Sequence, residues 1–97
     1  MLKTLTLSDF SPVVGSSFQV RTELDVSLQL ELLEAVELGA ASGARSSSFS
    51  LLFKGANDII LSQRIYPMRH PDLGELSIFL VPVSREADGM RYEAIFN

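Results

Sequence analysis

Residues 76–83 read Leu-Ser-Ile-Phe-Leu-Val-Pro-Val and form the longest largely apolar run in this sequence with a turn on each side. His-Pro-Asp-Leu-Gly (70–74) precedes the run, and Arg-Glu-Ala-Asp-Gly (85–89) follows it. Its β-branched and aromatic side chains favour a strand, and so uninterrupted a run is typical of a strand covered on both faces. We therefore expect 76–83 to be the middle strand of a hairpin pair, buried on both sides, with the rest of the chain wrapped around it.

Apolar and polar residues alternate in three further segments, with the period of a half-buried strand. These segments are 18–23, 48–54 and the last strand, where Tyr92, Ala94 and Phe96 alternate with Arg91, Glu93 and Ile95. Residues 61–68 are also predicted to be a strand that ends at the turn containing His70. Pro67 and Pro82 have no N–H to donate, so their strands should lie at an edge or carry a bulge there.

The connection before the last strand carries the strongest hairpin signal in the chain. Asp88-Gly89 predicts a five-residue connection in which Gly89 takes a positive φ. Residues 39–47 are rich in Gly and Ser and predict a loop.

Residues 28–38 fit either a helix or a strand. Their Leu, Glu, Gln and Ala content favours a helix that ends at Gly39. Leu28, Leu30 and Leu32 instead alternate with polar residues, and the phase of this alternation shifts after Leu33. A bulge near Leu32-Leu33 would repair that shift, because a bulge inserts one extra residue into a strand and bends it. The pattern thus favours a bulged strand, with a helix as the alternative.

The N-terminal residues 4–14 are predicted to form a short helix or a pair of turns. Ser8 is the expected N-cap, and Asp9 would lie in the first turn, where a negative charge is favourable. Leu7, Phe10 and Val14 share one helical face, which we expect to cover an open end or seam of the sheet.

Composition and strand spacing together limit the class of protein. The 97 residues make one β domain (1–97), with 46% hydrophobic residues, a net charge of −4 and no cysteine. We expect a mainly β fold, a small antiparallel barrel or sandwich of five to six strands with a short N-terminal helix. An acidic surface repels phosphate, which argues against a nucleic-acid or anionic-membrane partner. The sequence shows no signal peptide or membrane span, so a cytoplasmic location is expected.

Several blocks of the sequence resemble a small bacterial domain family of unknown function. They are residues 10–18 (Phe-x-Pro-x-Val-Gly-x-x-Phe), 49–55, 65–66, 70–74 (His-Pro-x-Leu-Gly), 79–82 (Phe-Leu-Val-Pro) and 92–97 (Tyr-Glu-Ala-Ile-Phe-Asn). The resemblance spans nearly the whole chain and supports a strand over 28–38. It implies no activity and no cofactor, and it associates such domains with phage tail-like assemblies.

Few residues suggest chemistry. His70 is the single histidine, so it would act either as a general base oriented by Asp72 or as a turn residue whose ring bonds the backbone. We favour the turn role, because no nucleophile is implied nearby. Glu31, Glu34 and Glu37 would be spread along a strand, which favours a solvated or partner-facing rim over a metal site. The serines at 46–48 and 50 lack the context of a nucleophile.

The sequence therefore predicts no catalytic, cofactor or metal site. Its one candidate interaction surface comprises Arg64, Tyr66 and Met68 on one side of their strand, with Arg91 nearby, since Tyr and Arg often anchor interfaces. The leading hypothesis is a non-catalytic structural or protein-interaction module, within a tail-like assembly or self-associating. The alternative is a small barrel that binds an apolar or mixed ligand among Phe49, Phe53, Phe79 and Tyr92.

Overall fold

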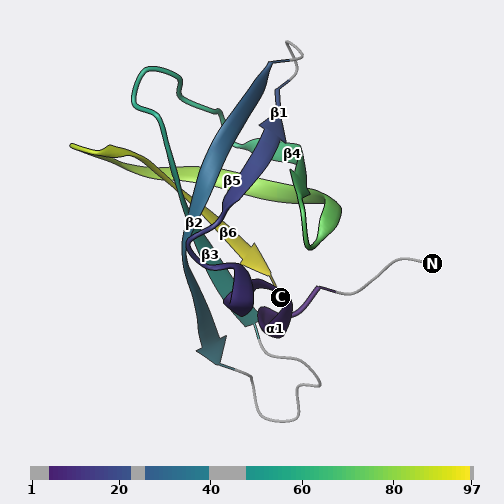
Figure 1. The fold of residues 1–97 in the computed structure, drawn as a ribbon. Helices are drawn as coiled ribbons and strands as arrows, with labels where there is room; N and C mark the ends of the chain where they lie inside the picture. The colour runs from purple at the N-terminus through teal and green to yellow at the C-terminus, as the bar shows by residue number, and fades with distance from the viewer. Residues whose placement is uncertain (1–4, 23–25, 40–47, 97) are drawn as a thin grey trace.

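The computed structural model describes residues 5–22, 26–39 and 48–96, and its strands form one closed antiparallel barrel (Figure 1). The elements in chain order are α1 (Leu7–Phe10), the 3-10 helix η1 (Ser11–Val13), β1 (Ser17–Arg21), β2 (Ser27–Gly39), β3 (Ser48–Gly55), β4 (Arg64–His70), β5 (Gly74–Glu86) and β6 (Gly89–Phe96). Around the barrel the order is β1-β2-β3-β6-β5-β4, and β4 pairs with β1 to close the ring. The predicted fold class, a small antiparallel barrel with a short N-terminal helix, is confirmed.

The strand β5 is the middle strand of two hairpins, as predicted, but only one of its faces is buried. It pairs with β4 over Gly74 to Leu80 and with β6 beyond that. Ile78 and Leu80 point into the core, whereas Phe79 is 47% exposed on the outside. The expectation of burial on both faces is wrong, because the strands of a small barrel share one interior and no described element covers the outer face of β5.

The strand β2 confirms the bulged-strand interpretation of residues 28–38 and excludes the helix. Leu32 lies opposite Phe53 and Glu34 lies opposite Leu52, so Leu33 is the extra residue. Leu30 and Leu32 are buried before the bulge, and Ala35 packs against the core after it. The alternation of apolar residues shifts by one position in this 13-residue strand. The bulge compensates for the shift, so apolar side chains on both sides of it point into the core.

The N-terminal helices cover one end of the barrel through Phe10. Its ring lies 5.9 Å from that of Phe49 and 5.6 Å from that of Phe96, and Figure 1 shows α1 beside the end of β6. The predicted N-cap is wrong. Thr6 occupies that position, and its backbone N–H donates to the Asp9 carboxylate at 2.9 Å.

The apolar face of these helices also differs from the prediction. Val13 is buried and Val14 is 43% exposed. The turn at Ser11–Val13 is a 3-10 helix with about three residues per turn, so Val13, three residues after Phe10, follows it onto the core side.

The boundaries of three other predicted segments shift in the structure. The strand β4 begins at Arg64 rather than residue 61, and His70 is its last residue rather than part of the turn. The β5–β6 connection is two residues long, Ala87 and Asp88, although Gly89 has the predicted positive φ of 143°. Residues 40–47 of the predicted loop, and Glu23 of the first predicted strand, lie outside the described residues.

Both prolines in the strands lie where a sheet tolerates them. The β1–β4 ladder contains Met68 and Arg69 but stops before Pro67. Pro82 lies beyond the last β4–β5 pair, which ends at Leu80, and a register shift follows it in the β5–β6 ladder. Pro82 is therefore at an edge and beside a bulge, as predicted.

Candidate functional site

Among the described residues, His70 is the one buried residue, apart from the tyrosines, that is polar or charged, and it is 3% exposed. Its ring centroid lies 4.5 Å from that of Phe18. The backbone N–H of Asp72 donates to Nδ1 at 3.0 Å, and Nε2 lies 2.8 Å from the Ser16 hydroxyl. A serine and a histidine in hydrogen-bond contact resemble the core of a nucleophilic dyad, so the direction of each bond decides what the pair can do.

The hydrogen bonds of this pair run opposite to those of a catalytic dyad. A backbone N–H can only donate, so His70 Nδ1 accepts and the ring proton sits on Nε2. Nε2 then donates to the Ser16 oxygen, and the Ser16 hydroxyl donates to the Val13 carbonyl. A general base must accept the serine proton, and in this arrangement His70 donates instead. The geometry therefore builds a structural bridge that joins the β4–β5 turn to the start of β1.

The predicted role of Asp72 as an orienting carboxylate is not formed, since its backbone N–H contacts the ring instead. This bond to the backbone is the contact that the turn-residue hypothesis requires. Ser16 was missed by sequence reasoning. It lies 54 residues from His70 in the chain, and no local motif connects the two positions.

The four residues of the predicted interaction surface do not share a surface. Tyr66 and Met68 are 4% and 3% exposed and belong to the core. Arg64 is exposed at the first position of β4. Arg91 lies on β6, which is separated from β4 by β5. Because the burial of a strand alternates, the side of β4 that carries Tyr66 faces inward, which the residue types alone did not reveal.

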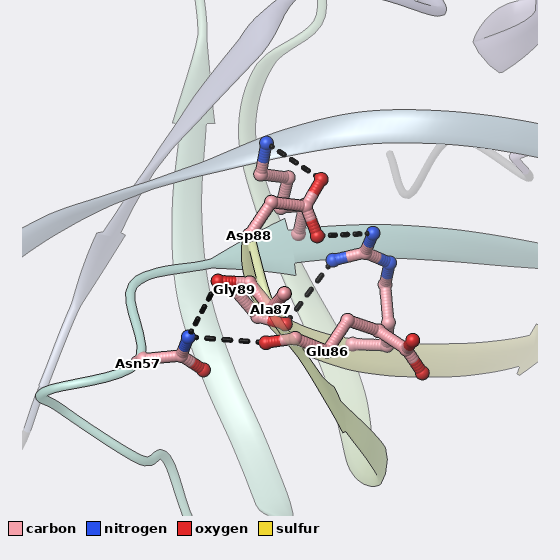
Figure 2. A network of polar contacts seen from close by, with 7 residues as sticks. Asn57, Glu86, Ala87, Asp88 and Gly89 are labelled. Carbon is pink, nitrogen blue, oxygen red and sulfur yellow. Dashed lines mark hydrogen bonds and ion pairs between the residues drawn. The ribbon is translucent and has the colours of Figure 1, made fainter.

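Arg91 instead belongs to a polar network at the β5–β6 turn (Figure 2). Its guanidinium donates to the Asp88 carboxylate at 2.8 Å and to the Gly89 carbonyl at 3.2 Å, while Lys54 contacts Asp88 at 3.3 Å. Hydrogen bonds from Arg91 and then Lys54 lower the pKa of Asp88 below 3.8. The Asn57 side-chain amide donates to the carbonyls of Glu86 and Ala87, which fastens the β3–β4 connection to this hairpin.

The two tyrosines fasten the same connection to the barrel. The Leu61 backbone N–H donates to the Tyr92 hydroxyl at 2.9 Å, and the Tyr66 hydroxyl donates to the Ser62 carbonyl at 2.6 Å. Burial raises the pKa of Tyr92 above 10.0, although the Leu61 hydrogen bond opposes the shift. Both hydroxyls are therefore structural groups that satisfy backbone atoms of a long loop.

The residues described offer little to a metal ion or to a ligand inside the barrel. Within the described ranges, no three His, Asp or Glu side chains lie close enough together to hold a metal. The lining expected for a ligand is split: Phe49, Phe53 and Tyr92 are buried in the core, while Phe79 lies outside. Two shallow grooves border the β1–β4 seam instead, and both are lined by Gln19, Arg69 and Glu75.

The most extensive unexplained feature is a group of apolar side chains on the outside of the barrel, which we call the outer apolar face. Its members are Ile65 (63% exposed), Phe79 (47%), Ile95 (53%) and Val36 (45%), together with the half-buried Val81 and Leu52.

The strand register places these residues on one face of the sheet. Ile65 lies directly opposite Phe79, and Val81 follows two residues along the same strand. Ser50 lies opposite both Ile95 and Val36. Directly opposed residues share one face of a sheet, with Cβ atoms about 5 Å apart. The outer apolar face is therefore continuous over β4 and β5. On the other strands polar residues interrupt it, because Glu93 lies between Val81 and Leu52, and Ser50 lies between Ile95 and Val36.

The fold and its site define a small closed β barrel whose buried histidine bonds a serine and a backbone amide and whose outside is in part apolar. No described helix has both the length and the apolar character needed to cross a membrane. The chain belongs to the family described as domain of unknown function DUF6916, which it matches over residues 5–96. No curated protein and no solved structure matches it.

Proposed function

We propose that this chain is a non-catalytic protein-interaction module that binds its partner through the outer apolar face. The observation that carries the proposal is the Ile65–Phe79 pair, two large apolar side chains directly opposite each other and 63% and 47% exposed. Monomeric proteins rarely expose large contiguous apolar patches, and those that exist are often contact sites. Burial of such area supplies about 25 cal/mol per Å², which is the main favourable term in association.

The chemistry of the other candidates supports the same proposal. The His70–Ser16 bridge has its protons in the structural direction, and the ion pairs at Asp88 hold a hairpin together. A net charge of −4 favours a protein partner over a phosphate backbone. A role within a larger, tail-like assembly is consistent with these features and forms part of the proposal.

Site-specific photocrosslinking in the source cells tests this function. A photoreactive amino acid in place of Phe79 should give a defined crosslinked protein, and the same probe at Ser77 is the matched control. Ser77 is exposed on the same face of β5 as Phe79, but the residue opposite it is Pro67 rather than Ile65. An additional Ile65→Ser change should weaken the crosslink at position 79. Equal labelling from both positions, or none from Phe79, would refute the proposal.

A further inference from the structure

The strand β2 is longer than its neighbour β1, and its C-terminal half therefore forms a sheet edge. β1 covers β2 from Ser27 to Glu31, whereas β3 follows it on the other side as far as Gly39. Gly15 and Ser16 make the last contacts on the β1 side, one bond to each backbone polar group of Leu32. Over residues 33–38, nothing in the described chain pairs with β2 on the side away from β3.

The register shows which backbone groups point outward along this edge. The N–H and C=O of Leu32 bond Ser16 and Gly15, so they point away from β3 and from Phe53 opposite. Hydrogen-bonded and non-hydrogen-bonded pairs alternate in an antiparallel ladder. Leu51 and Phe49 face the same way as Phe53 on β3, so the residues opposite them repeat the orientation of Leu32. These residues are Ala35 and Glu37, whose N–H and C=O groups are thus directed at the edge.

The overhang of β5 beyond its ladder with β4 is protected. Beyond Leu80, β5 has no partner on the β4 side, but Pro82 and a bulge interrupt that edge and the Asn57 side chain bonds the carbonyls at its end. Prolines, bulges and covering loops are the usual devices that keep sheet edges from pairing. Register irregularities at Leu33 and Leu38 bound this edge of β2. Between them, over residues 34–37, the edge has no proline and no described strand pairs with it, which makes it a template for an added strand.

The charge of this edge selects the kind of strand that fits. Neither Glu34 nor Glu37 forms an ion pair with a described residue. Glu34 and Glu37 lie on opposite faces of β2, because Leu52 and Phe49 opposite them lie on opposite faces of β3. A second copy paired along the same edge would bring two carboxylates to each face of one short ladder, and like charges across a ladder are destabilising. Val36 and Leu38 lie beside these carboxylates and are 45% and 52% exposed, so an added strand would also bury apolar surface.

We propose that residues 34–37 of β2 bind an extended segment of a partner protein that carries a Lys or Arg on each face of its strand, three residues apart, with apolar residues between them. The inference rests on the proposed interaction function and adds to it the partner's conformation and charge. The added strand extends the barrel sheet at Val36, where the edge meets the outer apolar face, so one partner contacts both surfaces.

Three labelled probes test the inference on the full chain: the hexapeptide Lys-Val-Val-Lys-Val-Val, the matching Glu-Val-Val-Glu-Val-Val, and the first hexapeptide with N-methylated backbone amides. The basic probe should bind and slow amide hydrogen exchange at Ala35 and Glu37. The acidic probe should bind about tenfold more weakly or not at all. The N-methylated probe should fail, because it keeps the charge but cannot form the ladder.

Variants of the edge provide the matched controls. Glu37→Pro removes an edge-directed N–H and a charge, and Glu37→Ala removes the charge alone, so the proline variant should lose more binding. Glu34→Lys with Glu37→Lys should reverse the preference between the acidic and basic probes. Circular dichroism shows whether each variant is folded. If a variant does not fold, the N-methylated probe still tests strand addition, because it is used with the unaltered chain.

The outcomes separate this inference from the proposed function. Equal binding of the two charged probes, or unchanged exchange at Ala35 and Glu37, would overturn it. A dimer that forms with concentration and is dissolved by Glu37→Pro would also overturn it, since a second copy would then occupy the edge. If the crosslink from Phe79 persists in any of these cases, the interaction function stands and only the strand-addition site is lost. If the crosslink is absent while the basic probe still binds as expected, the outer apolar face is refuted instead.

Discussion

The bond between Ser16 and His70 shows how a single buried histidine can be structural and yet resemble a reactive group. Both ring nitrogens are used, one by the Asp72 backbone and one by the Ser16 hydroxyl, and the ring packs on Phe18. If the ring were lost, the Asp72 N–H would lose this acceptor and the Ser16 oxygen would lose its donor, while the Ser16 hydroxyl would still donate to the Val13 carbonyl. Since an unsatisfied buried polar group costs about 1–3 kcal/mol, the bridge should be measurable as stability.

A double-mutant cycle measures the coupling across this bridge. His70→Phe keeps the aromatic contact but removes both hydrogen bonds, and should lower the free energy of unfolding by about 1–3 kcal/mol. Ser16→Ala should also destabilise the protein, but much less once His70 is already Phe, giving a coupling of about 0.5–3 kcal/mol. Urea denaturation of the four proteins provides the measurement. Strictly additive effects would show that the two side chains do not act together.

Tyr92 should make the folded protein less stable at alkaline pH. Burial raises its pKa above 10.0, so the folded state favours the neutral phenol. A group whose pKa is raised on folding contributes stability that is present below its unfolded pKa and is lost as the pH rises through the folded one. Stability should therefore fall above pH 10, and Tyr92→Phe should remove this part of the alkaline loss while costing about 1–3 kcal/mol at neutral pH for the abandoned Leu61 N–H.

Urea midpoints measured from neutral to alkaline pH in both proteins check this. In a Tyr66→Phe variant, Tyr92 is the one remaining tyrosine, so ultraviolet titration of the phenolate reports it directly. A midpoint at or below 10.0 would contradict the prediction.

Single residues were the part of the candidate site that sequence reasoning located least well. His70 was singled out correctly because it is the one histidine, but its partner Ser16 carries no signal at a separation of 54 residues. Tyr66 and Arg91 were grouped by residue type, and the structure separates them because the ring order places β5 between their strands. Residue type thus identified the side chains that could react or bind, whereas the topology determines which side chains lie next to them.

The hairpin β5–β6 depends on a glycine that no other residue can replace at low cost. Gly89 has a φ of 143°, and a Cβ at this position would overlap the Gly55 carbonyl oxygen. Gly74 also has a positive φ, of 74°, but a Cβ there meets nothing within 4 Å. The two turns therefore differ in steric contact and share the strain of the left-handed region.

Alanine at each position separates these two effects. Gly74→Ala should cost about 1–2 kcal/mol, the backbone strain alone. Gly89→Ala should cost more, because it adds a clash with backbone that cannot rotate away. Thermal and urea unfolding of both variants would measure the order. Equal losses would show that the β3–β6 contact at Gly55 yields easily.

The strands were predicted well wherever apolar and polar residues alternate, as in β1, β3 and β6. The shift after Leu33 even located the bulge of β2, because an inserted residue leaves a direct trace in the pattern. The apolar run at β5 led to the wrong prediction of burial on both faces, for the opposite reason. Phe79 and Val83 are apolar although they face outward, 47% and 49% exposed, so the alternation is hidden. Exposed apolar residues look like core in a sequence, and here they mark the proposed contact face.

The seam between β1 and β4, which closes the barrel, has the fewest residue pairs of any strand pairing in the sheet. β1 has five residues, and just two residue pairs join it to β4, whereas β4 and β5 share seven. Fewer ladder bonds leave less to oppose local opening, so this seam should open more readily than the rest of the sheet. Pro67, next to the ladder, cannot extend it by a further amide donor. Amide exchange should therefore be faster in β1 than in β5 or β6.

A disulfide across the seam tests this prediction. Gln19 lies directly opposite Arg69, and opposed residues in a ladder are about 4.5–5.5 Å apart at Cα, within the range that a disulfide spans. The sequence has no cysteine, so Gln19→Cys with Arg69→Cys creates a single pair. Its loop of about 50 residues should stabilise the protein by up to about 4 kcal/mol.

The disulfide should restrict the local opening of β1 more than that of the other strands. Oxidation should slow amide exchange at Phe18 and Val20 more than in β6, because it removes the opening in which β1 leaves β4 while the core stays folded. The same protein in its reduced form is the control for the loss of the Arg69–Glu75 ion pair, which at 67% and 78% side-chain exposure contributes little. If oxidation raises global stability but leaves β1 exchange unchanged, the seam does not open on its own, and the barrel unfolds as one unit despite its two-pair closure.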